Sequence, residues 1–197
     1  MKFFVKFVFL AVSFLCFSAY IQAETFHNIC KDGSVQDVAK ALKDGGDINS
    51  LSKDLQTPLI QASKYNGPEV VQFLIESGAG VNVKDENGKS ALMYACEENK
   101  DVEVVRVLIR KHADVNAKTN TGKTALMYAC ENNPNIKIIS ALIEAGADVN
   151  AKTKDGRTPL DYAGKNENKK TVMLIKALLI KAGAGSGVQD LSELEKI

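Results

Sequence analysis

The chain has 197 residues, and its 25 basic and 24 acidic side chains give a formal net charge of +1 at pH 7. This balance argues against nucleic acid and against an anionic membrane surface as partners, because binding to either calls for a clear basic excess. The length suits a single extended domain rather than several independent ones.

The first 23 residues have the form of a secretory signal peptide. Lys2 and Lys6 supply positive charge, residues 7–19 form an apolar run, and Ala23 offers a small residue at a cleavage point. We therefore expect residues 1–23 to be removed, which takes away two lysines and no acid and leaves a net charge of −1. The content of Phe, Lys and Asn is typical of a bacterial protein, so the expected location is the periplasm or the outside of the cell.

An uncleaved anchor in the inner membrane is the alternative for the same segment. The stretch from Phe3 to Ile21 has 19 residues, which is barely enough to span a bilayer, and it contains Lys6. After cleavage we expect no contact with the membrane.

Two short sequence motifs recur along the rest of the chain, and their repeats have the same spacing. The first opens at Thr57 as TPLIQA and returns at Ser90, Thr124 and Thr158, in steps of 33, 34 and 34 residues. The second phrase ends at four asparagines with the same spacing, namely Asn49, Asn82, Asn116 and Asn150. Self-similarity at this period indicates a stacked helical repeat.

Each unit has the pattern of two helices and a loop. Thr57 is a suitable N-cap, and Pro58 follows at the first helical position, where a missing N–H costs nothing. A second helix is predicted where apolar residues recur at helical spacing, as in residues 70–75, and Gly78 ends it in a left-handed conformation. Dipeptides such as Asn87-Gly88 predict tight turns at the loop tips.

This register, with its T-P-L-x-x-A opening, resembles the ankyrin repeat family from about Glu24 to Ala184. The resemblance implies an all-α solenoid of about five helix-pair units with β-turn loop tips. The units are expected at residues 24–56, 57–89, 90–123, 124–157 and 158–184, with atypical end units, and residues 185–197 are expected to form a flexible tail.

The cysteines beyond the signal segment share one register position. Cys30, Cys96 and Cys130 follow the register position of the small residue in the first helix, which is held by Ile29, Ala95 and Ala129. Neighbouring helices in a stack lie roughly 10 Å apart, whereas a disulfide tolerates about 7 Å between Cα atoms. We therefore expect three reduced, buried thiols. His27 and His112 are far apart and have no partner with metal-ligand spacing, so no metal or other cofactor is expected.

Acidic side chains gather at Glu97, Glu98 and Glu131, but no nucleophile, second acid or pocket-forming loop accompanies them. Catalysis is therefore not expected.

The family resemblance implies that a protein partner is held by the loop tips and the exposed side of the first helices, on a concave face. Tyr94 and Tyr128 recur there beside Met93 and Met127, and such residues are favoured at interface centres. Packing of this column between tips and helices is an equal alternative. The candidate partner-binding residues are Tyr65, Glu86, Asn87, Lys89, Met93, Tyr94, Glu97, Glu98, Asn120, Thr121, Lys123, Met127, Tyr128, Glu131, Asn132 and Arg157.

Lys89, Lys123 and Arg157 are predicted to form a basic row along the tips, facing the acidic residues of the first helices. The sequence thus predicts a monomeric, non-enzymatic protein-binding module that protects or regulates an exported enzyme. The alternatives are an envelope-anchored scaffold and a secreted binder that is directed at a host or neutralises a toxin.

Overall fold

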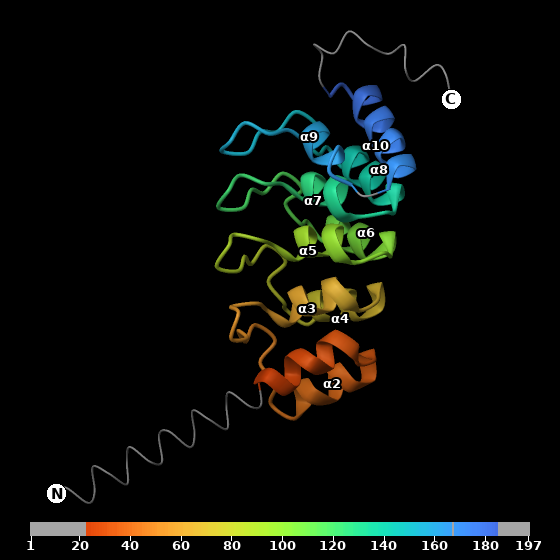
Figure 1. The fold of residues 1–197 in the computed structure, drawn as a ribbon. Helices are drawn as coiled ribbons and strands as arrows, with labels where there is room; N and C mark the ends of the chain where they lie inside the picture. The colour runs from red at the N-terminus through yellow and green to blue at the C-terminus, as the bar shows by residue number, and fades with distance from the viewer. Residues whose placement is uncertain (1–22, 167, 185–197) are drawn as a thin grey trace, which may run out of the picture.

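The computed structural model describes residues 23–166 and 168–184, which form five helix pairs stacked in one column (Figure 1). This confirms the predicted all-α solenoid; within the described residues the one strand-like contact is an isolated bridge between Lys84 and Ser90. Every described helix is too short or too polar to cross a bilayer. The predicted signal peptide, apart from Ala23, and the predicted tail lie outside the described residues.

In each pair a first helix near the loop tips precedes a second helix on the far side. The pairs are residues 23–32 with α2 (Val35–Lys43), α3 (Pro58–Tyr65) with α4 (Pro68–Glu76), α5 (Ala91–Glu98) with α6 (Val102–Arg110), α7 (Ala125–Asn132) with α8 (Ile136–Glu144), and α9 (Pro159–Ala163) with α10 (Lys169–Lys181). First helices pack on first helices, as α3, α5, α7 and α9 do in turn, and second helices pack on second helices.

The predicted caps form at Thr57 and Thr124, whereas the Ser90 side chain makes no capping hydrogen bond to α5. The Thr57 hydroxyl accepts from the backbone N–H of Ile60 at 3.3 Å, and Pro58 begins α3. Gly78 follows α4 with φ +102°, and His112 adopts φ +64° at the corresponding position after α6. These left-handed residues let the chain leave each second helix toward the next loop tip.

The core runs without interruption through the stack. Leu59, Leu92 and Leu126 are buried at one register position. Cys30, Cys96 and Cys130 are buried and free, as predicted. Burial raises the pKa of Cys30 and of Cys130 to about 12, so these thiols stay protonated at neutral pH.

A ladder of asparagines ties each unit to the one before it. Asn99 Nδ2 donates to the carbonyls of Ser63 and Asn66 at 3.1 and 3.0 Å, and Asn133 Nδ2 donates to those of Cys96 and Asn99 at 2.9 and 2.8 Å. The acceptors lie at the C-terminal ends of the preceding first helices, where carbonyls lack helical partners. Asn66 and Asn166 make the same kind of bond at either end of the ladder.

The two end units carry charge where the inner units bury apolar side chains. Asp37 is exposed at the register position of Val70 and Val104, and Lys176 is exposed at that of Val71 and Val105. Such polar substitutions are expected where the face of an end unit meets water.

Candidate partner-binding surface

Alternating lysines and tyrosines run between the loop tips and the first helices, along the side that the resemblance predicts to be concave. Lys89 Nζ lies 3.8 Å from the ring centroid of Tyr94 and 4.3 Å from that of Tyr128. Lys123 Nζ lies 4.1 Å from the Tyr128 centroid and 4.6 Å from that of Tyr162. We call these five residues the Tyr–Lys ladder; its cation–π contacts link the second to the fifth unit.

Tyr94 of the ladder joins two loops to its helix by hydrogen bonds. The Tyr94 hydroxyl donates to Asp85 Oδ2 at 2.7 Å and accepts from Gln56 Nε2 at 2.8 Å. Asp85 also accepts from the backbone N–H of Lys89 at 2.8 Å. Burial, followed by the hydrogen bond to Asp85, raises the pKa of Tyr94 above its ordinary value. Burial likewise raises the pKa of Tyr128 to about 12.

The methionines predicted to stand beside this column lie in the core instead. Met93 and Met127 are fully buried at the register position of Ile60, which is also fully buried. Their helices stack on both sides against neighbouring first helices, so a side chain at this position contacts protein rather than solvent. Met93 and Met127 therefore support the concave surface from beneath.

The predicted basic row also differs in detail. Lys89 pairs with Glu97 and Lys123 pairs with Glu131, so these cations neutralise the acids that they were expected to face. Arg157 instead pairs with Asp155 within its own tip, with Nε 3.0 Å from Oδ2. Two of the three cations of the predicted row are thus closed in ion pairs with the acids of the next first helix, and the third is paired within its own loop.

The tips of the last three loops are joined into one row. The backbone N–H of Asn120 donates to the Asn87 carbonyl at 3.0 Å, and that of Lys154 donates to the Thr121 carbonyl at 3.0 Å. Asn120 Nδ2 adds a bond to the Glu86 carbonyl at 2.8 Å. The exposed members of the predicted set fall into two groups. Those on the loop tips are Glu86, Asn87, Asn120, Thr121 and Arg157, and those at the C-terminal ends of first helices are Tyr65, Glu98 and Asn132.

The first loop tip has a different character. Leu55 has φ +54° at the register position of Gly88, Gly122 and Gly156, which are also left-handed. A side chain in this conformation costs roughly 1–2 kcal/mol, yet Leu55 is 45% exposed, and Leu51 on the same loop is 51% exposed. Neither leucine is among the predicted site residues. The sequence does show that Leu55 replaces the glycine of the later tips, which marks this loop as different from the others.

A cleft of about 260 Å³ lies between this tip and the first helices. The shorter Gln61 and Gln56 stand here at the register positions that Tyr94 and Lys89 occupy in the next repeat. His27 fastens the loop, because its ring nitrogens lie 2.7 Å from the Ala23 carbonyl oxygen and 2.9 Å from that of Gln56. The residues that line the cleft include Lys31, Lys53, Lys64 and Tyr65.

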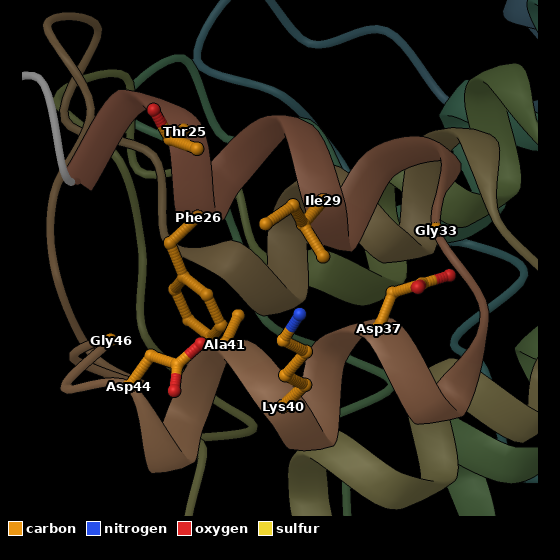
Figure 2. A pocket seen from close by; sticks show the side chains of 9 residues that line it. All are labelled: Thr25, Phe26, Ile29, Gly33, Asp37, Lys40, Ala41, Asp44 and Gly46. Carbon is orange, nitrogen blue, oxygen red and sulfur yellow. The ribbon is translucent and has the colours of Figure 1, made fainter.

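A second hollow, of about 470 Å³, lies on the outer face of the first unit (Figure 2). Phe26, Ile29 and Ala41 line it between the two helices, with Lys40 and Asp37 beside them. It forms because Ala41 stands where the later units bury Leu74, Leu108 and Leu142. The hollow is thus a consequence of the smaller side chain in an end unit.

Comparison with known families agrees with the geometry. A family model described as ankyrin repeats (3 copies) matches residues 26–119 and 98–190. The chain belongs to the ankyrin repeat family. Members of this family act as protein–protein interaction modules and are generally non-enzymatic, so a protein-binding role follows for this stack.

Individual relatives share short stretches with the chain. The fowlpox virus ankyrin repeat protein FPV230 is 48% identical over 48 residues, which are 24% of this chain and 26% of that protein. The phosphocholine transferase AnkX of Legionella pneumophila is 36% identical over 75 residues, 38% of this chain and 8% of AnkX. The Arf-GAP with coiled-coil, ANK repeat and PH domain-containing protein 2 of Gallus gallus is 34% identical over 64 residues, 32% of this chain and 8% of that protein. The chain thus spans only a small part of each.

Proposed function

We propose that this ankyrin stack is a monomeric, non-enzymatic module that is exported to the periplasm or secreted and holds one protein partner on its concave face. The observation that carries the proposal is the row of loop tips. Backbone hydrogen bonds join Asn87 to Asn120 and Thr121 to Lys154, and so hold the tips in fixed positions relative to one another. A surface fixed in advance loses little conformational entropy on binding. Regulation or protection of an exported enzyme is the role that we propose for such binding.

The chemistry of the acidic side chains and of the thiols supports binding over catalysis. Glu97 and Glu131 are held in ion pairs with lysines, and the buried thiols of Cys30 and Cys130 have a raised pKa. Within the described residues, no group of three or more His, Cys, Asp and Glu side chains is arranged to hold a metal ion. The activity named for AnkX belongs to a protein of which the chain matches only 8%, so the similarity does not carry that activity to this chain.

Crosslinking tests where the partner binds. A photoreactive residue at Asn120 on the tip row is expected to crosslink one protein in the producing cell. The same residue at Arg106, exposed on α6 on the side of the stack away from the tips, is the matched control and is expected to give no such product (Figure 1). Equal yields from both positions would argue against a concave binding face.

Export is tested by sequencing the N-terminus of the protein recovered from each cell fraction. A start at Glu24 is expected, in the periplasm or the medium, because the segment before it has the form of a signal peptide. An intact N-terminus that sediments with the inner membrane would instead identify an envelope-anchored scaffold. Recovery from the medium alone would favour a secreted binder that acts on a host or a toxin.

A further inference from the structure

The last helix of the stack carries an apolar strip on its outward side. Met173, Ala177 and Ile180 are spaced four and three residues apart, so they lie along one side of α10. Met173 is 46% exposed, whereas Val102 and Ile136 at its register position pack against the core. In the inner units the next second helix packs on this side, whereas α10 lies at the end of the stack (Figure 1). We call Met173, Ala177 and Ile180 the α10 strip.

Lysines surround the α10 strip. Helical geometry places Lys169 and Lys176 on one side of it and Lys170 and Lys181 on the other, and all four are exposed. The helix itself contains no acidic residue. Within the described part of the chain, none of these four lysines forms an ion pair. The end of the stack thus presents an apolar centre with a basic rim.

The chain departs from the repeat pattern directly after α10. Gly183 has φ +94°, and Ala184 is buried, as Ala147 is at the same register position. In that inner loop Val149 follows two residues later and packs against the core, but Ser186 stands at the corresponding place, between two glycines. A Gly-Ser-Gly stretch is a flexible connection, so the sequence favours a change of direction here over another repeat loop.

The sequence of residues 188–197 complements the α10 strip in both polarity and charge. Leu191 and Leu194 are three residues apart, a spacing that places them side by side on one face of a helix. Asp190 and Glu195 would stand on the two sides of that face. The segment has three acids and one base, so its net charge is opposite to that of α10.

The length of the segment also suits the strip. A helix of ten residues is about 15 Å long, and Met173 and Ile180 lie about 10 Å apart along the axis of α10. Three residues, 185–187, separate the segment from the buried Ala184, and connections of this length commonly join antiparallel helices. The segment can therefore reach the strip of its own chain.

We propose that residues 188–197 form a helix that packs antiparallel on the α10 strip of the same chain. Leu191 and Leu194 contact Met173 and Ile180, and the acids of the segment pair with the lysines beside the strip. The segment then serves as the cap that the last unit of a repeat stack requires. This proposal replaces the expected flexible tail, and it is independent of whether the concave face binds a protein.

Hydrogen exchange of the full chain tests the docked segment. The backbone amides of residues 188–197 are expected to exchange at least tenfold more slowly than in a synthetic peptide of the same sequence, and high salt is expected to weaken this protection. Leu191→Asp is expected to abolish it and to speed exchange in α10. Gln189→Asp is the matched control, because it adds the same charge on the opposite face of the helix, and it is expected to keep the protection.

A second pair of variants tests the α10 strip itself. Met173→Asp is expected to abolish the protection of residues 188–197. Leu174→Asp is the matched control, because Leu174 is 44% exposed on the same helix and its register position holds the exposed Glu69 and Lys137 in inner units. It is expected to keep the protection. Circular dichroism at the helix band checks that both variants retain the stack.

Other outcomes overturn the proposal. If residues 188–197 exchange as fast as the free peptide, they do not cover the strip. If Leu191→Asp and Gln189→Asp have equal effects, the apolar face of the segment is not what docks. If Met173→Asp loses helix content, the two variants of the segment decide alone, since they change no residue of the stack. If the protein sediments as oligomers that Met173→Asp dissociates, the strip binds a second copy of the chain instead.

Discussion

Replacing Asn133 by Ala is expected to lower the free energy of unfolding by about 3 kcal/mol. Asn133 is 1% exposed, and its Nδ2 donates to the carbonyls of Cys96 and Asn99. The substitution leaves both carbonyls without a donor in a place that water does not reach, at roughly 1–3 kcal/mol for each unsatisfied group. The measurement is the midpoint of urea unfolding, followed by circular dichroism at the helix band.

Two further variants separate hydrogen bonding from packing at this position. Asn133→Asp keeps the shape of the side chain but, with an ionised carboxylate, loses both donors, so it is expected to be as harmful as Ala at neutral pH. Asn82→Ala is the exposed control: Asn82 bonds the His112 carbonyl and the Asp114 N–H at 3.1 and 2.8 Å, but water can replace it. If Asn133→Ala and Asn82→Ala lower the free energy of unfolding equally, burial is not the reason that the asparagine ladder stabilises the stack.

Replacing Tyr94 by Ala is expected to cost about 3–4 kcal/mol of stability, as truncation of a buried aromatic side chain usually does. The ring lies between Lys89 at 3.8 Å and Lys64 at 4.7 Å from its centroid, and its hydroxyl joins Asp85 to Gln56. Tyr94→Phe keeps the ring and loses those two bonds, so a smaller loss of about 1–2 kcal/mol is expected. Thermal and urea unfolding of both variants measure the difference.

Tyr65→Ala is the matched comparison for Tyr94→Ala. Tyr65 is exposed and lies at the end of α3, so its truncation is expected to change stability by less than about 1 kcal/mol and to weaken the partner complex. The opposite pattern would be a Tyr94→Ala variant that is as stable as the natural chain but no longer binds the partner. That result would show that the tyrosines contact the partner rather than stabilise the fold.

The sequence by itself determined the architecture. The period near 33 residues, the Thr57 and Thr124 caps and the glycines after the second helices are local signals, because capping and turn formation involve residues only a few positions apart. The three buried cysteines also followed from register, since equivalent positions in stacked units have equivalent surroundings.

Only the tertiary structure decided which candidate side chains reach solvent. A helix as short as α5 exposes a narrow strip, and whether Met93 or Glu98 lies on it depends on how α3 and α7 pack on either side. The pairing of Lys89 with Glu97 and the strained, exposed Leu55 likewise arise from the way each loop tip meets the next unit. Such contacts join residues distant in sequence or depend on one unit's departure from the repeat, so the repeat pattern alone cannot specify them.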